Sequence, residues 1–218
     1  MRWPTGIAEA KEIQESLRKN VKIIPLMKTP EYVAGVDAAF LGDKIISVAC
    51  LYSYPDLTPI EERYAVAEIP FPYIPGYLSF REGPAVIQAL SSLNIRPDII
   101  LFDGQGIAHP KGLGIAAHIG ALLDLTSIGC AKSRLVGEYK EPGYNKGDWS
   151  PLTFKSGVVG AVLRTRGNVR PLFVSPGHRI DLEGSIEIVL RCTSKYRIPE
   201  PLRRADSLSK KLKKDISL

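Results

Sequence analysis

The strongest indication of the fold is the segment Asp98 to Asp103, which reads DIILFD. The run is short and almost wholly apolar, which is typical of a central strand that helices cover on both faces. Its last residue is a carboxylate, at the position where open α/β sheets place their functional groups. We therefore expect an α/β fold with a functional site at Asp103.

Three β-rich runs precede this segment, and we expect strands over residues 32–40, 44–51 and 64–69. The first two are joined by LGDK, a tight polar connection that contains glycine and is typical of a hairpin. Short connections between three early strands indicate an antiparallel start to the sheet rather than a strict βαβ repeat.

Helical spacing of apolar residues predicts an N-terminal helix over residues 7–19 and a second helix that has Glu82 near its start. The remaining expected elements are a helix after the glycine-rich loop 104–120, strands at 126–131, 155–164 and 172–175, a helix over 181–196 and a final helix after Pro201. Strands and helices in this order predict a mixed central sheet flanked by helices.

The length and composition indicate a single globular domain that spans residues 1–218, because 218 residues with 44% apolar content can bury a substantial core. The formal charge of +6 and the pI near 9.2 favour a polyanionic partner. Lysine and arginine gather in the tail over about 201–218, which in the alternative interpretation is only a solvated helix end.

Targeting and redox features are absent from the sequence. The N-terminal stretch MRWPTGIAEAKEIQ carries charge every few residues, and no apolar run approaches the ~20 residues of a membrane span. Cys50, Cys130 and Cys192 are widely spaced and lack the pattern of a zinc site. We expect a cytoplasmic enzyme with no membrane partner and with reduced, buried cysteines.

Two aspartates stand in runs where a buried charge is costly. Asp37 interrupts the apolar strand VAGVDAAF, and Asp103 ends DIILFD. Carboxylates on adjacent strands could share one hard cation. Each alone could instead be a capped turn or an ion pair, but Glu82 and Asp206 add further carboxylates and favour the metal site.

The segment Phe71 to Gly76 (FPYIPG) predicts a rigid, shaped loop, because two prolines restrict its backbone. Tyr73 lies between Pro72 and Pro75, so its ring could be held outward at low entropic cost and wedge between bases. A packed turn is the alternative. The loop GQG could cradle a phosphate, but it lacks the GK[ST] and GxGxxG patterns.

Four segments in the same order resemble the endonuclease V family over nearly the whole chain. They are PYIPGYLSFRE (72–82), DGQGIAHPKGLGIAAHIG (103–120), SPGHR (175–179) and YRIPEPLRRAD (196–206). The resemblance implies a ribonuclease H-like fold. It also implies a DNA repair endonuclease that recognises deoxyinosine, hydrolyses the second phosphodiester bond 3′ to the lesion, and leaves the lesion in the nicked strand.

The resemblance also implies the site residues. Asp37 and Asp103 match metal-binding aspartates for Mg²⁺, for which Mn²⁺ can substitute, and the catalytic set is Asp37, Glu82, Asp103, Lys132 and Asp206. The implied DNA wedge is Pro72, Tyr73, Ile74 and Pro75, and the implied base pocket is Gly76, Leu78, Gly106, Gly114, Ile115 and Leu135. Carboxylates and Mg²⁺ together supply the charge neutralisation and the activated water that phosphodiester hydrolysis needs.

Charged and imidazole side chains outside this set could contact phosphate. His109 and His178 are candidates, although widely separated histidines also serve as hydrogen-bonding or capping groups. The lysines at 210, 211, 213 and 214 could add contacts to the DNA backbone that weaken with salt.

Three other functions remain as alternatives. Some relatives prefer RNA, so an inosine-specific endoribonuclease is the first. A nucleic-acid-binding module without catalysis is the second, which the intact Asp37, Glu82 and Asp103 disfavour. A sugar kinase or other ATPase of related fold would need a phosphate-binding hairpin and a longer chain. We expect a monomer whose partner is deoxyinosine-containing DNA, with inosine-containing RNA as the alternative.

Overall fold

The computed structural model describes residues 3–216. The expected domain range 1–218 therefore includes residues 1–2 and 217–218, which lie outside the described residues. In chain order the elements are α1 (Ile7–Arg18), β1 (Tyr32–Leu41), β2 (Lys44–Ser53), β3 (Pro59–Glu68), α2 (Leu78–Ser91), β4 (Ile99–Phe102), α3 (Ile115–Leu123), β5 (Thr126–Ala131), β6 (Trp149–Phe154), β7 (Gly157–Leu163), β8 (Leu172–His178), α4 (Leu182–Arg191) and α5 (Glu200–Ile216).

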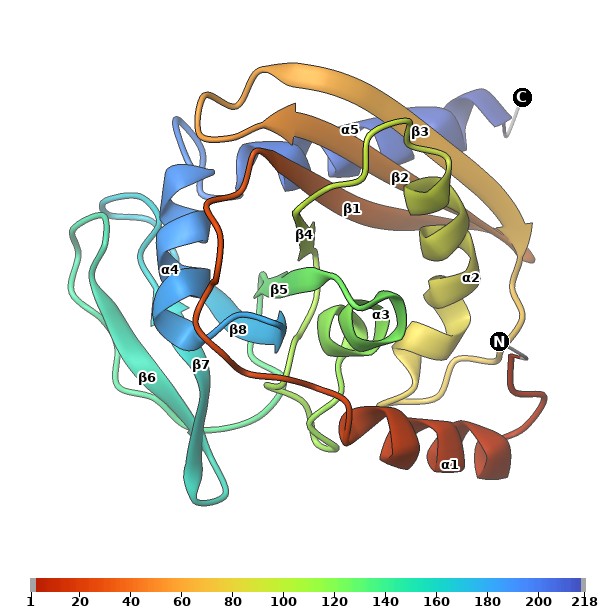
Figure 1. The fold of residues 1–218 in the computed structure, drawn as a ribbon, viewed down its shortest axis with the longest axis horizontal. Coiled ribbons are helices and arrows are strands. Elements are labelled where there is room, and N and C mark those ends of the chain that lie inside the picture. The colour runs from red at the N-terminus through yellow and green to blue at the C-terminus, as the bar shows by residue number, and fades with distance from the viewer. Residues whose placement is uncertain (1–2, 217–218) are drawn as a thin grey trace.

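The strands form one eight-stranded mixed sheet in the order β3-β2-β1-β4-β5-β8-β7-β6 (Figure 1). The first three strands are antiparallel, as the short connections between them predicted. β1, β4 and β5 run parallel, and β8, β7 and β6 continue the sheet in antiparallel pairs. The expected mixed α/β architecture is confirmed.

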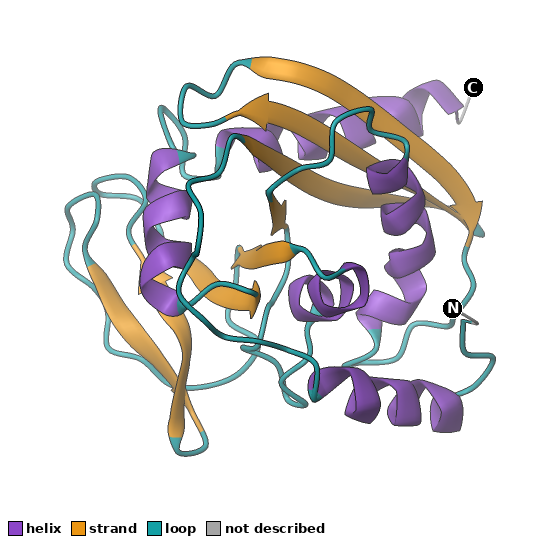
Figure 2. Cartoon of the chain, viewed as in Figure 1, coloured by secondary structure: helices purple, strands orange, loops and turns teal. Residues whose placement is uncertain are grey.

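Helices cover both faces of the sheet (Figure 2). One apolar cluster joins the sheet to α4 and α5, and a second joins it to α2 and α3. β4 contributes to both, because Ile99 and Leu101 point to the first cluster and Ile100 and Phe102 to the second. This alternation confirms that DIILFD contains a central strand buried on both faces.

A proline inside α2 is accommodated by the N-terminal segment. Pro84 has no backbone N–H and leaves the carbonyl of Phe80 without its helical partner. The indole N–H of Trp3 donates to this carbonyl at 2.6 Å. An added Cβ on Gly83 would lie 2.6 Å from the Trp3 ring, so glycine is needed there. These contacts stabilise the turn of α2 that carries Glu82.

A close approach between β1 and α5 depends on Gly35. A Cβ added at Gly35 would lie 2.2 Å from the carbonyl carbon of Pro201 in the first turn of α5. The helix therefore lies directly on the strand, with Leu202 and Ala205 buried in the core beneath it. This contact brings the next turn of α5 close to Asp37, two residues after Gly35 in β1.

Several element boundaries differ from the sequence prediction. β6 was not expected, because its central Pro151 disfavours a strand interior, but an edge strand tolerates proline. β7 begins at Gly157 rather than residue 155, since Lys155 has φ +55 and belongs to the turn.

β3 begins at Pro59, earlier than expected, because charge is common on edge strands and hides the apolar pattern. β8 continues to His178, so SPGH is strand rather than loop, and α4 ends at Arg191. Cys50, Cys130 and Cys192 are buried free thiols, as expected. Among residues 3–216 no helix is long and apolar enough to cross a membrane.

Candidate active site

The register of the parallel strands brings Asp37 and Asp103 together. Val36 of β1 is paired with Phe102 of β4, so the next residues, Asp37 and Asp103, lie side by side at the carboxyl end of β4. The backbone N–H of Asp103 donates to the carbonyl of Val36 at 3.4 Å and continues this ladder. Two aspartates 66 positions apart in the sequence thus become neighbours.

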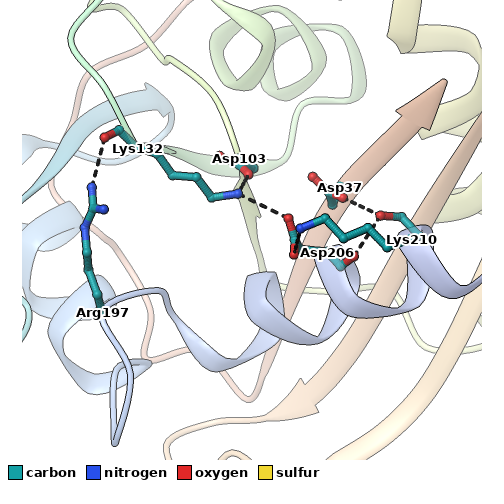
Figure 3. Close-up of polar contacts among 7 residues, drawn as sticks. Asp37, Asp103, Lys132, Arg197, Asp206 and Lys210 are labelled. Carbon is teal, nitrogen blue, oxygen red and sulfur yellow. Dashed lines mark hydrogen bonds and ion pairs between the residues drawn. The ribbon is translucent and has the colours of Figure 1, made fainter.

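Helix α5 adds a third carboxylate beside Asp37 and Asp103. Asp37, Asp103 and Asp206 each offer an oxygen, and these oxygens lie within 4.8 Å of one another (Figure 3). All three side chains are partly buried. An all-oxygen donor set of this kind fits a hard divalent cation better than a soft one. The acidic trio could therefore hold a metal ion, and the structure brings Asp206 into it.

Two lysines compensate part of the negative charge. Lys132, directly after β5, lies with its Nζ 2.5 Å from Asp103 and 3.2 Å from Asp206, while Lys210 contacts Asp206 at 2.6 Å (Figure 3). Burial alone would lower the pKa of Lys132, but hydrogen bonds from its ammonium to Asp103 and Asp206 raise that pKa. Arg197 donates to the Lys132 carbonyl at 2.9 Å.

Glu82 completes the acidic site from the opposite face of the sheet. With Asp37 and Asp103 it lines a small cavity of about 90 Å³. Burial, together with the charges of Asp37 and Asp103, raises the pKa of Glu82 to about 8. Burial likewise raises the pKa of Asp37 to about 6, against a hydrogen bond from Ser209 that lowers it. In the folded chain without a cation, Glu82 is therefore mostly protonated at pH 7, whereas Asp37 is mostly ionised.

These shifts predict a pH dependence of stability for the metal-free chain. Asp37 and Glu82 bind protons more tightly folded than unfolded, where their pKa values are 3.8 and 4.5. Their contribution to the free energy of unfolding is therefore greatest below about pH 4, falls as the pH rises, and levels off above about pH 8. Urea unfolding in a chelating buffer at several pH values measures it.

The variant Glu82→Gln is the control for this prediction, because glutamine is neutral at every pH. The decline in the free energy of unfolding between about pH 5 and pH 8 should be smaller in this variant than in the unchanged chain. An equal decline in both proteins would show that Glu82 does not carry a raised pKa.

An apolar pocket of about 180 Å³ lies beside the acidic site. Five of the six residues expected in a base pocket line it, namely Gly76, Leu78, Gly114, Ile115 and Leu135. Gly106 lies behind the wall instead, where an added Cβ would lie 2.0 Å from the carbonyl oxygen of Pro176. Its glycine serves close packing of the loop on β8.

Exposed apolar side chains surround the mouth of this pocket. Tyr73 is 70% exposed, and Leu78 and Leu135 are also exposed. Of the expected wedge residues, Pro72 and Pro75 are exposed with Tyr73, whereas Ile74 is partly buried against the cluster of Ala10, Phe71 and Phe80. The loop therefore presents Tyr73 outward and uses Ile74 as an anchor.

Helix α1 also holds the Tyr73 loop in place. Gln14 is buried and donates from Nε2 to the carbonyl of Gly76 at 3.0 Å. Gly76 has φ +85, a backbone conformation that favours glycine. A buried anchor, two prolines and this hydrogen bond give the Tyr73 loop a defined shape.

Sequence reasoning missed several groups around the site. Gln105 is 8% exposed and lines the pocket, and its Nε2 donates to the Ser133 carbonyl at 3.1 Å. Its Oε1 has no hydrogen-bond partner among residues 3–216. Ser79 and Leu113 also line the pocket, and Ser209 contacts Asp37. Only the spacing of Ser209, three residues after Asp206, offered a signal in the sequence.

The two histidines expected to contact phosphate lie elsewhere. His178 is 1% exposed, accepts from the Lys22 N–H at 3.2 Å and contacts Asp124 at 3.0 Å. It pairs with Ser127 near the start of β5, whereas the acidic trio lies at the other end of the central strands. This position argues against a phosphate contact. His109 lines the apolar pocket, and burial lowers its pKa to about 4, so its ring is neutral at pH 7.

A ribonuclease H-like mixed sheet with carboxylates gathered at the carboxyl ends of its central strands is typical of metal-dependent nucleases. Comparison with known proteins identifies the family. The family model described as Endonuclease V matches residues 15–207. The chain therefore belongs to the Endonuclease V family of DNA repair nucleases.

Individual relatives agree with this assignment. An Endonuclease V from Nostoc sp. is 52% identical over 210 residues, which is 95% of each chain. The crystal structure of Endonuclease V from Streptomyces avermitilis has a TM-score of 0.95 and 40% identity, and covers 99% of this chain and 96% of its own. Endonuclease V of Ciona intestinalis, in complex with a 23mer DNA containing an inosine followed by a ribo-adenosine, has a TM-score of 0.84 and 30% identity over 96% of this chain and 97% of its own.

Proposed function

We propose that the chain is a Mg²⁺-dependent endonuclease that recognises deoxyinosine in DNA. It hydrolyses the second phosphodiester bond 3′ to the lesion and leaves the deaminated base in the nicked strand. Membership of the Endonuclease V family supports the reaction class, and the inosine-containing DNA bound to the Ciona intestinalis protein supports the substrate.

One observation carries the proposal: the apolar pocket and the acidic site share a wall. Ile115 lines both the pocket below Tyr73 and the small cavity between Asp37, Glu82 and Asp103. A base held in the pocket would therefore have its DNA backbone close to the acidic groups. Recognition of a lesion and cleavage of a nearby phosphodiester then occur on one side of the molecule.

The acidic residues supply the hydrolytic site. Asp37, Asp103 and Asp206 would hold Mg²⁺, with Mn²⁺ as a substitute. The charge of the bound cation would lower the pKa of Glu82 from its raised value in the metal-free chain, so that Glu82 could accept a proton from the attacking water. A bound divalent cation neutralises charge on the phosphate and favours ionisation of water. Lys132 would leave its contacts with Asp103 and Asp206 and neutralise charge on the scissile phosphate.

The pocket supplies lesion recognition. Tyr73 wedges between bases while the deaminated base turns out of the helix, a step that costs a few kcal/mol and less for a mispaired base. Gln105 lines the pocket, and a turn of its side chain would bring the buried, unpartnered Oε1 to the N1–H of hypoxanthine as an acceptor. Neutral His109 belongs to the pocket wall in this proposal, rather than to a phosphate contact.

The remaining parts of the proposal rest on the family and on the sequence. The lysines of α5 at 210, 211, 213 and 214 contact the DNA backbone without regard to base sequence. The chain acts as a monomer in the cytoplasm. Gel filtration with and without a lesion duplex tests the monomer.

Matched substrates test the proposed function. Duplexes that are identical except for one deoxyadenosine, deoxyinosine or inosine are incubated with the chain and Mg²⁺, and the nicked position is mapped. We expect a nick at the second phosphodiester 3′ to deoxyinosine, none on the undamaged duplex, and none when a chelator replaces Mg²⁺.

The other outcomes favour the alternatives. Cleavage restricted to the inosine substrate would favour the endoribonuclease, an outcome that the ribo-adenosine in the DNA of the Ciona intestinalis complex makes worth measuring. Lesion binding without nicking in any metal would indicate an inactive binding module. Inertness toward every substrate would remove the enzymatic proposal.

A further inference from the structure

A buried serine joins the two elements that carry the acidic trio. Ser209 lies one turn after Asp206 on α5 and is 1% exposed. Its Oγ is 2.6 Å from Oδ2 of Asp37 in β1 and 3.0 Å from the backbone carbonyl oxygen of Asp206. The hydroxyl therefore links a strand and a helix whose residues are 172 positions apart.

The shorter of these contacts indicates which oxygen the hydroxyl group donates to. A serine inside a helix usually donates to a backbone carbonyl three or four residues earlier. Here the carboxylate oxygen of Asp37 is 0.4 Å closer than the carbonyl of Asp206, 2.6 against 3.0 Å. Donation to a carboxylate is stronger than donation to a neutral carbonyl, so the proton belongs to the bond with Asp37.

Asp37 needs such a partner more than the other two aspartates do. Lys132 pairs with Asp103 and Asp206, and Lys210 pairs with Asp206. The carboxylate of Asp37 is repelled by both neighbouring aspartates and receives its hydrogen bond from Ser209. Without that bond its side chain could turn away from the like charges beside it.

We propose that Ser209 is a positioning residue for the metal site. Its hydroxyl fixes the carboxylate of Asp37 toward Asp103 and Asp206, so that the three oxygens converge before a divalent cation arrives. The inference rests on the metal-dependent function proposed above. Ser209 acts through Asp37 and has no contact of its own with substrate.

Direct titration with Mn²⁺ tests the role of Ser209. Electron paramagnetic resonance measures free Mn²⁺ in the presence of the full chain, the variants Ser209→Ala and Ser209→Thr, and the control Ser207→Ala, which removes an exposed hydroxyl from the same helix. Loss of a group that orients a metal ligand typically weakens binding about tenfold or more. We expect that loss in Ser209→Ala, near-normal affinity in Ser209→Thr, and no change in Ser207→Ala.

Nicking and unfolding measurements separate positioning from a general structural role. We expect Ser209→Ala to need about tenfold more Mn²⁺ for half-maximal nicking and to approach the unchanged rate at saturating Mn²⁺. Thermal unfolding without metal should be nearly the same in the Ala and Thr variants, while their Mn²⁺ affinities differ.

Two results would overturn the inference: equal Mn²⁺ affinity of Ser209→Ala and the unchanged chain, or equal weakening in Ser209→Ala and Ser209→Thr. Failure of the unchanged chain to bind Mn²⁺ at all is a different result. It would overturn the metal-dependent function itself.

Discussion

The variant Asp103→Ala should lose nicking of a deoxyinosine duplex by about a thousandfold or more while it retains most of its affinity for the lesion. Asp103 contributes an oxygen to the acidic trio and a partner to Lys132. Its removal takes away part of the negative charge that binds the cation during hydrolysis. Such losses reduce the rate by about 10²–10³ or more. The pocket is lined by other residues, so binding should survive.

Nicking and binding are measured separately for this variant. Single-turnover cleavage gives the rate, and fluorescence anisotropy with a labelled duplex gives the affinity. Asp56→Ala is the matched control, because Asp56 is an exposed aspartate in the turn between β2 and β3. This turn lies near the start of β1, at the other end of the strands from the acidic trio. Unchanged nicking by Asp103→Ala would show that Asp103 is not part of the hydrolytic site. Loss of lesion binding would show that the acidic trio also contributes to lesion recognition.

The variant Tyr73→Ala should lose lesion preference rather than hydrolytic ability. Stacking of a base on an aromatic ring contributes about 1–3 kcal/mol, so the ratio of nicking on deoxyinosine and undamaged duplexes should fall about 10- to 100-fold. Tyr73→Phe keeps the ring and should keep the ratio. A single-stranded deoxyinosine substrate needs no strand separation, so Tyr73→Ala should cleave it almost as well as the unchanged chain.

Tyr144→Ala is the control for this experiment. Tyr144 is also 70% exposed, but it lies against Arg164 and does not line the pocket. Loss of preference in both variants would mean that any exposed tyrosine matters nonspecifically. Intact lesion preference in Tyr73→Ala would refute the wedge.

Local sequence patterns predicted most of the fold. The apolar run Ile99–Phe102 was placed correctly as a central strand, because burial on both faces leaves no polar position in it. The early hairpin followed from β-rich runs and a short polar turn. β6 was missed because Pro151 contradicts a strand locally, and only its place at the sheet edge makes it acceptable.

The candidate site was predicted in part. Asp37 and Asp103 could be recognised because a carboxylate in an apolar strand is costly and needs a reason. Asp206 carried no such local signal, since a carboxylate among lysines and arginines is ordinary on a helix surface, and only the family resemblance assigned it to the catalytic set. His178 in PGHR appeared well placed to contact phosphate. However, β8 continues through that motif to His178, which pairs with Ser127 near the start of β5, at the end of the strands far from the acidic trio.

By itself, the sequence determined which residues are apolar, the type and order of most strands and helices, and which charges lie in costly apolar surroundings. Those properties depend on neighbours along the chain. The tertiary structure alone decided that Ser209 donates to Asp37, that Gln105 lines the pocket, and how close Asp206, which the family resemblance had assigned to the site, comes to Asp37. Each of these contacts joins segments distant in the sequence. Their geometry is set by the register of β1 on β4 and the packing of α5 on Gly35, which no local pattern records.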